Sequence, residues 1–204
     1  MLYVQLRKKL SHFTLDVDFQ VGNETVILFG PSGSGKTTIL NCIAGLDAPD
    51  QGKIELNKVV LTKDKQLITS TPKRQVGYVF QDYALFPHKT ILENIKYGSS
   101  DDSLINHLLT ILKIDHLRSQ YPHQISGGEK QRLALARALA AKPDVLLLDE
   151  PFSSLDERTK YECHSELLRL KQEWNIPIIL VTHDSKEAEQ LGDRILSIEK
   201  GKLE

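Results

Sequence analysis

The chain has 204 residues, of which 40% are hydrophobic and 26% are charged, and its formal net charge is −1. This length predicts one domain over residues 1–204, with a smaller subdomain inserted in it, and disfavours a second independent domain. The near-zero net charge disfavours nucleic acid as the main partner. No apolar run has the length of a membrane-spanning helix and the first residues lack a signal-peptide pattern, so we expect a cytoplasmic protein.

The first third of the chain has the patterns of β-strands. Residues 2–7 predict a strand, and residues 13–19 alternate apolar and polar side chains, which is typical of an antiparallel strand with one wet face. Residues 25–29 are apolar without a break, which predicts a strand covered on both faces, as in a parallel sheet. A hairpin is predicted over residues 53–62, and residues 76–80 return to the core sheet.

The middle of the chain has a different pattern. Residues 82–142 predict a helical insertion, because strand patterns stop there and residues 101–114 place apolar side chains at helical spacing. Further strands are predicted at residues 145–148, 178–181 and 194–199. We therefore expect an α/β fold with a mostly parallel core sheet, an N-terminal antiparallel β piece and an inserted helical subdomain.

An apolar stripe with helical spacing precedes the strand at residues 178–181. It consists of Cys163, Leu167, Leu170 and Trp174, and we expect these side chains to pack in the core. Cys163 and Cys42 do not form a C-x-x-C motif, so both are expected to be buried thiols in a reducing compartment.

A glycine-rich loop follows the strand at residues 25–29 and fits the phosphate-loop pattern G-x-x-x-x-G-K-[ST] between a strand and a helix. Its glycines let several backbone N–H groups point into one concavity that holds a polyphosphate. Lys36 adds a charge for the β- and γ-phosphates, and Thr37 offers a hydroxyl to Mg²⁺. The alternative is a plain glycine-rich turn before a helix. The predicted nucleotide-binding residues are Gly30, Pro31, Ser32, Gly33, Ser34, Gly35, Lys36, Thr37 and Thr38.

Two acids end the strand at residues 145–148. Ligands of open α/β sheets bind at the carboxyl ends of the strands, so Asp149 and Glu150 are expected beside the phosphate loop. Asp149 is suited to hold Mg²⁺, and Glu150 is suited to polarise the attacking water. The alternative is a pair of acids that only begin a turn with Pro151.

A third motif, Ser126-Gly127-Gly128-Glu129, precedes a strong helix-forming segment. Serine and two glycines at a helix start leave backbone N–H groups free for an anion. The alternative is an ordinary N-cap, with Ser126 capping its own helix. The phosphate loop upstream and the acids downstream favour the anion-binding interpretation.

These motifs occur in one order with Gln81 after a core strand, residues 154–156 and His183. In that arrangement the chain resembles the nucleotide-binding subunit of an ATP-binding cassette (ABC) transporter over essentially all of its length. Within the family, residues 77–82 and 85–88 resemble importer subunits. Residues 13–19 and 71–78 are most similar to molybdate importers and less closely to sulfate importers.

The resemblance implies ATP and Mg²⁺ as cofactors and gives roles to further residues. Gln81 would contact Mg²⁺ and the attacking water, His183 the γ-phosphate, and Asp156 would cross a dimer interface. Gln81 as a surface side chain and His183 as a structural histidine remain the alternatives. The residues that would bind the γ-phosphate of ATP held by a second copy are Ser126, Gly127, Gly128 and Glu129.

The implied function is ATP hydrolysis that drives solute uptake, by a head-to-tail homodimer around two MgATP. The implied partners are membrane-spanning permease subunits and, indirectly, an extracytoplasmic solute-binding protein, with no nucleic acid. The subunit would be peripheral on the cytoplasmic face of the membrane, and we expect no C-terminal regulatory domain. The alternative from another class is a soluble ABC ATPase that acts on nucleic acid or ribosomes. Such proteins usually carry two cassettes or a long coiled coil, which this sequence lacks.

Two departures from the family pattern are visible in the sequence. Ile125 and Glu129 stand where the family usually has leucine and often has glutamine. The aromatic that stacks on adenine in this family has no counterpart in residues 7–11, where only the adjacent His12 is placed to reach the base. The adenine contact and the transported solute are therefore left open.

Overall fold

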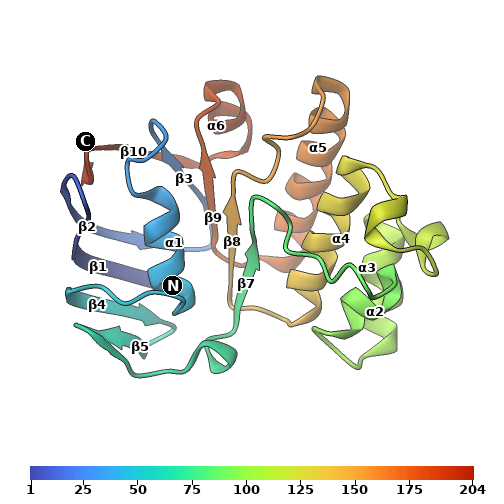
Figure 1. The fold of residues 1–204 in the computed structure, drawn as a ribbon, viewed down its shortest axis with the longest axis horizontal. Helices are drawn as coiled ribbons and strands as arrows, with labels where there is room; N and C mark the ends of the chain where they lie inside the picture. The colour runs from blue at the N-terminus through green and yellow to red at the C-terminus, as the bar shows by residue number, and fades with distance from the viewer.

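A computed structural model describes residues 1–204, and its strands form one 11-stranded sheet (Figure 1). The N-terminal part of this sheet is antiparallel and lies at the left in Figure 1. In the predicted alternating strand, Leu15, Val17 and Phe19 are buried while Asp16 and Asp18 are exposed. The antiparallel strands are β1 (Leu2–Lys9), β2 (Thr14–Val21), β4 (Gln51–Leu56), β5 (Val59–Lys63) and β6 (Gln66–Leu67).

The core of the sheet is parallel, which confirms the predicted fold class. The short strand β11 (Lys202–Leu203) pairs with both β10 and β2 and so joins the core to the antiparallel part. The strand order is β6-β5-β4-β1-β2-β11-β10-β3-β9-β8-β7. The core strands are β3 (Thr25–Phe29), β7 (Val76–Val79), β8 (Val145–Asp149), β9 (Ile178–Thr182) and β10 (Arg194–Glu199).

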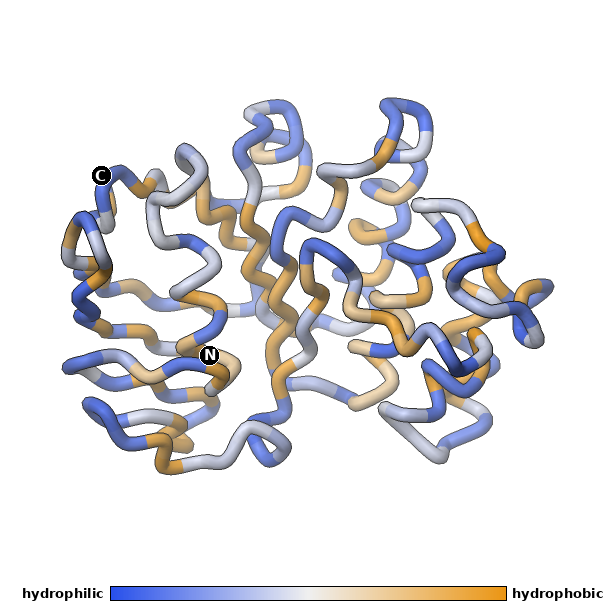
Figure 2. The backbone as a smooth tube through the Cα atoms, in the orientation of Figure 1, coloured by the Kyte–Doolittle hydropathy of each residue, from blue (hydrophilic) through white to orange (hydrophobic).

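The unbroken apolar runs are covered on both faces, as predicted. Along β8, Val145 and Leu147 belong to one buried cluster, whereas Leu146 and Leu148 belong to a second cluster on the opposite face. Figure 2 shows the result as continuous hydrophobic colour along the central strands. Because both faces need a cover, helices lie on either side of this part of the sheet.

The helix α1 (Lys36–Ala44) packs on one face, and the helices of the middle and C-terminal parts cover the other. Between β7 and β8 the chain forms helices and no strand, which Figure 1 shows at the right. None of the helices is both long enough and apolar enough to cross a membrane. The remaining α-helices are α2 (Ile91–Lys96), α3 (Asp102–Ile111), α4 (Gly127–Ala140), α5 (Glu157–Trp174) and α6 (Ser185–Leu191).

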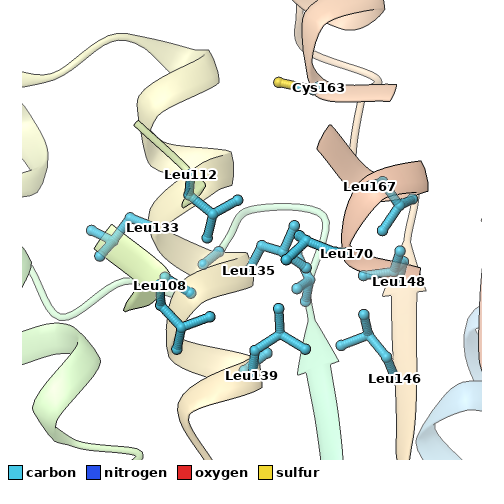
Figure 3. Close-up of a cluster of buried hydrophobic side chains, with 14 of the residues drawn as sticks. Leu108, Leu112, Leu133, Leu135, Leu139, Leu146, Leu148, Cys163, Leu167 and Leu170 are labelled. Carbon is cyan, nitrogen blue, oxygen red and sulfur yellow. The ribbon is translucent and has the colours of Figure 1, made fainter. Parts of the chain in front are cut away.

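The helices α4 and α5 pack against the sheet through leucines, and α3 packs against α4 (Figure 3). Leu135 of α4 and Leu170 of α5 lie between the helices and the strand residue Leu148. The predicted apolar stripe is confirmed for Cys163, Leu167 and Leu170, which are at most 3% exposed, whereas Trp174 is only half-buried. This packing fixes α4 and α5, whose first residues carry the motifs of the sequence.

One buried arginine joins the antiparallel part to the core. Arg74 is 1% exposed and follows the 3₁₀-helix η1 (Thr71–Lys73). Its guanidinium donates to the carbonyl oxygens of Cys42 and Ile43 in the last turn of α1, where the regular helical hydrogen bonds end. It also donates to the carbonyl oxygen of Leu61 and the hydroxyl of Thr62 in β5.

Candidate active site

The predicted phosphate loop connects β3 to α1 and turns sharply at its glycines. Gly35 has φ 106°, a conformation that other residues rarely adopt. Gly30 lies so close to the neighbouring strand β10 that a Cβ atom there would be 2.2 Å from the carbonyl oxygen of Ile198. The loop can therefore follow this path only with glycine at both positions.

Lys36 is the first residue of α1 and is only 5% exposed. Its ammonium donates to the carbonyl oxygens of Gly30 at 2.7 Å and Pro31 at 2.8 Å. Burial lowers the pKa of Lys36, and the carboxylates of Glu150 and Asp149 oppose this shift. The lysine is thus held across the loop as a charge that has little contact with water, which strengthens its attraction for a phosphate.

The loop borders a cavity of about 300 Å³, the size of a small-molecule site. Gln81, which follows β7, also lines this cavity and is exposed. The lining residues are Leu10, Ser32, Gly33, Gly35, Lys36, Thr37, Thr38, Gln81 and Glu150.

Asp149 and Thr37 are 112 residues apart in sequence but adjacent in the fold, as the rule for strand ends predicts. The Thr37 hydroxyl donates to Oδ1 of Asp149 at 3.1 Å. Burial, and then the nearby Glu150 carboxylate, raises the pKa of Asp149, while the bond from Thr37 lowers it. Thr37 lines the cavity, and its hydroxyl contacts the Asp149 carboxylate. A hydroxyl and a carboxylate are hard oxygen donors, and this donor set fits Mg²⁺.

Glu150 follows β8 in a left-handed conformation with φ 45°, which is uncommon for a residue with a side chain. Its backbone N–H donates to the carbonyl oxygen of Val181 in β9. Oε2 of Glu150 lies 3.3 Å from Nδ1 of His183, which follows the end of β9. The strained turn thereby brings the carboxylate of one strand end to the imidazole of the next.

The motif at residues 126–129 does not line this cavity. Ser126 caps α4, and its Oγ accepts from the backbone N–H of Glu129. In return, Oε2 of Glu129 accepts from the backbone N–H of Ser126 at 2.7 Å and from its hydroxyl at 2.8 Å. The bond from the Ser126 N–H lowers the pKa of Glu129, so the helix start carries a carboxylate. Within one chain, the motif therefore behaves as a capping box.

The Asp156 carboxylate likewise forms its hydrogen bonds within its own chain. Its carboxylate accepts from the backbone N–H of Thr159 at 3.1 Å and from the Thr159 hydroxyl at 2.6 Å, and so caps α5. These bonds lower the pKa of Asp156. The starts of α4 and α5 lie against each other, since a Cβ on Gly128 would be 2.4 Å from the methyl carbon of Thr159.

The sequence analysis did not identify two residues that lie at the site. Leu10 lines the cavity and belongs to residues 7–11, where the family pattern has an aromatic. Only its place just before the alternating strand could have indicated it. The Tyr78 hydroxyl is 3.5 Å from Oδ2 of Asp149, and it donates to the side chain of Asn41 at 3.1 Å. Burial raises the pKa of Tyr78, so it stays a neutral donor beside the acid. His12 does not line the cavity.

Comparison with known proteins relates this arrangement to a family. A model of the family described as "ABC transporter" matches residues 14–153, more than half of the chain. The molybdenum import ATP-binding protein ModC of Haemophilus influenzae is 44% identical over 98% of this chain and 58% of its own length. The molybdate/tungstate import ATP-binding protein WtpC of Archaeoglobus fulgidus is 41% identical over 99% of this chain and 87% of its own.

Among solved structures, the dimeric post-hydrolysis form of the ATP-binding cassette MJ0796, bound to ADP and Pi, aligns with a TM-score of 0.85. It is 30% identical, over 100% of this chain and 97% of that one. The chain spans somewhat less than three fifths of the length of several of the molybdenum import relatives. Since both the family model and these relatives cover most of its residues, this chain belongs to the family of ABC transporter ATP-binding proteins.

Proposed function

We propose that this chain is an ATP hydrolase that drives solute import as a head-to-tail dimer. One observation carries the proposal, which is the meeting of the Lys36 ammonium, the Thr37–Asp149 pair and Glu150 at one cavity. These groups come from different strand ends and serve no common purpose in packing. Together they match what phosphoryl transfer needs, namely a phosphate charge, a magnesium site and a base.

Binding of the triphosphate would rest on the loop. Its backbone N–H groups and Lys36 would hold the β- and γ-phosphates, and a charge-assisted hydrogen bond of this kind is worth about 1.5–3 kcal/mol. The Lys36 ammonium would exchange the carbonyl oxygens of Gly30 and Pro31 for phosphate oxygens. Thr37 and Asp149, with Gln81 from the cavity lining, would hold Mg²⁺, which when bound offsets phosphate charge as it develops.

The chemical step would use Glu150 as the general base. Its carboxylate takes a proton from water, the water oxygen attacks the γ-phosphorus, and the bond to the β–γ bridging oxygen breaks to release ADP. His183, 3.3 Å from Glu150, would orient the carboxylate and contact the γ-phosphate. The turn that strains Glu150 keeps this carboxylate at the cavity rather than in solvent.

A second copy would complete the site. The start of α4 does not line the cavity of its own chain, yet Ser126 and Gly127 are exposed at a helix end that attracts anions. In a head-to-tail pair, this end would meet the γ-phosphate held by the partner, and Asp156 would lie at the interface. The dimeric MJ0796 cassette bound to ADP and Pi supports this assembly.

The solute would be an oxyanion such as molybdate, which the names of the ModC and WtpC relatives support. Passage would belong to permease subunits that the chain contacts from the cytoplasmic face, with a solute-binding protein acting from outside. The segment after Gln81 offers a surface for such a contact, because Tyr97 is 71% exposed. The inserted helical subdomain, about residues 82–142, would carry this surface.

Phosphate release by the purified chain tests the hydrolase. We expect activity with MgATP, loss of activity on chelation of Mg²⁺, and specific activity that rises with protein concentration, because each site needs two chains. Specific activity that is constant over a wide concentration range would contradict the shared site. Absence of phosphate release, with and without permease subunits in proteoliposomes, would contradict the hydrolase itself.

The solute is tested by the ATP hydrolysis of the complex with its permease subunits. Its rate in the presence of a molybdate-loaded binding protein is compared with the rate in the presence of a sulfate-loaded one.

A further inference from the structure

The two residues on either side of His183 are held by one buried network. Thr182 is 2% exposed, and its hydroxyl donates to Oε2 of Glu187 at 2.6 Å. The same hydroxyl accepts from the backbone N–H of Asp184 at 3.0 Å. Glu187, on α6, is itself 4% exposed. The backbone that carries the imidazole is therefore fixed from behind, on the side away from the phosphate loop.

A lysine from a different helix completes this network. The Lys160 ammonium lies 3.3 Å from Oε1 of Glu187 and 3.6 Å from Oδ2 of Asp184. Burial alone would lower the pKa of Lys160, but the hydrogen bond and charge of Glu187 raise it, so the side chain remains a cation. Lys160 belongs to the first turns of α5, four residues after the capping residue Asp156.

The network and the proposed base meet at a small cavity of about 60 Å³. Every residue that lines it is polar, and the lining includes Lys160 and Glu187 of the network together with Glu150 and His183. Since the lining has no apolar residue, the polar bonds of the network are the contacts available here to set the distance between His183 and Glu150.

We propose that Lys160 is a positioning residue, which holds His183 against Glu150 and links that geometry to the segment before α5. This inference rests on the proposed hydrolysis of ATP. Because Lys160 extends from α5, a shift of residues 153–156 on dimer contact would move the Glu187 carboxylate, and with it Thr182 and His183. The link would let assembly of the pair set the reactive geometry.

The first test compares three lysine variants in ATP hydrolysis. Lys160→Met keeps most of the apolar stem and removes the charge, Lys160→Arg keeps the charge, and Lys186→Met is the matched control. Lys186 is an exposed neighbour that makes no ion pair with a carboxylate. We expect Lys160→Met to lower kcat by roughly tenfold to a hundredfold with KM for MgATP unchanged, as a misplaced reacting group does. The arginine variant and the control should retain kcat.

Two further measurements separate positioning from a general loss of structure. In a His183→Ala background, Lys160→Met should lower the residual single-turnover rate no further. In the nucleotide-free chain, ¹⁵N NMR of the His183 imidazole should report a changed Nδ1 resonance in Lys160→Met but not in Lys160→Arg or Lys186→Met. Should Lys160→Met fail to fold, Glu187→Gln removes the same ion pair and should give the same results.

An equal loss of rate with and without His183, or unchanged imidazole resonances, would overturn the inference. The NMR comparison needs no ATP hydrolysis. A chain that lacks hydrolysis altogether but shows the imidazole change would therefore contradict the proposed function and leave the positioning role of Lys160 supported.

Discussion

The two sides of the proposed nucleotide site differ in how complete they are within one chain. On the phosphate-loop side, Thr37 already contacts Asp149, and Glu150 already faces His183. On the side at the start of α4, Ser126 exchanges its hydrogen bonds with Glu129. On the phosphate-loop side, polar groups line a cavity. At the start of α4, the polar groups form hydrogen bonds with one another.

This difference suggests how binding and hydrolysis are separated. In the proposed function a single chain would hold MgATP, because Lys36 and Thr37 at the start of α1 already lie beside Glu150 and Asp149 at the end of β8. It would lack the groups that cover the outer face of the γ-phosphate, because the start of α4 does not line the cavity of its own chain. Closure of a pair would draw this helix end toward phosphate against the nearby negative charge of Glu129. Binding should then need one chain, and hydrolysis two.

The largest expected effect comes from a substitution on the phosphate-loop side that stops hydrolysis and leaves ATP binding intact. Glu150→Gln keeps the size of the side chain but removes the base, and we expect hydrolysis to fall by roughly 10² to 10⁴, about 3–5 kcal/mol of barrier. ATP should still bind, and ATP-bound dimer should accumulate on gel filtration. Glu199→Gln, at the end of β10, is the matched control. Hydrolysis at the native rate in Glu150→Gln would remove Glu150 from this role.

Lys36→Ala tests whether the phosphate-loop side binds nucleotide by itself. Loss of one charge-assisted hydrogen bond of about 1.5–3 kcal/mol predicts roughly ten- to a hundredfold weaker ATP binding, measured by calorimetry on dilute, monomeric chain. The exposed Lys200→Ala is the control. Unchanged affinity would mean that the backbone N–H groups alone hold the triphosphate.

A mixing experiment tests the side at the start of α4 directly. Ser126→Arg places a bulky cation at the helix end, and Lys36→Ala damages the loop, so each homodimer should be nearly inactive. In the mixed dimer both lesions fall in one site and the other site is native. Random pairing at equal amounts then predicts about a quarter of wild-type hydrolysis, if one intact site turns over alone. Activity that stays flat at all ratios, with heterodimers confirmed by differential tags, would contradict two independent shared sites.

The smallest expected effect is on the free energy of unfolding, which the buried Asp149 carboxylate lowers. Burial raises the pKa of Asp149, so folding disfavours its charged form. That penalty is complete at neutral pH and disappears as pH falls below the ordinary carboxyl pKa of about 3.9. Asp149→Asn should therefore raise the free energy of unfolding at neutral pH, and the gain should shrink toward pH 4. Asp144→Asn, just before the same strand, is the control in urea unfolding. A gain independent of pH would reject the electrostatic explanation.

Much of the fold could be predicted because single patterns determine it. The strands at residues 25–29 and 194–199 have the predicted bounds, since their apolar runs are flanked by clear turns. The two-residue strands β6 and β11 were not predicted, because two residues are too few to show a period, and only their pairing with neighbouring strands defines them. The helix α1 begins at Lys36, and apolar periodicity could not locate this start because the first turn lines the cavity with polar residues.

Residues of the candidate site could be predicted from the sequence where a general rule places distant residues together. Strand ends meet at one edge of the sheet, which is why Asp149 could be expected beside Thr37. No such rule predicts Tyr78, which reaches Asp149 from within β7, or Leu10, which borders the cavity from a loop. The sequence also gave no sign of Lys160, because its partners Glu187 and Asp184 meet it only through the packing of α5 against α6.

The buried side chain of Arg74 has a consequence for how the protein unfolds. Arg74 bonds at once to the last turn of α1 and to β5, and it has no carboxylate to keep it satisfied if either segment leaves. Detachment of the antiparallel part would therefore break the charge-assisted hydrogen bonds of a guanidinium that joins both segments, and neither segment alone satisfies that guanidinium. The nucleotide loop and the flanking β piece should for this reason melt as one cooperative unit. A denaturant titration followed by probes in the two parts would then give superimposable curves.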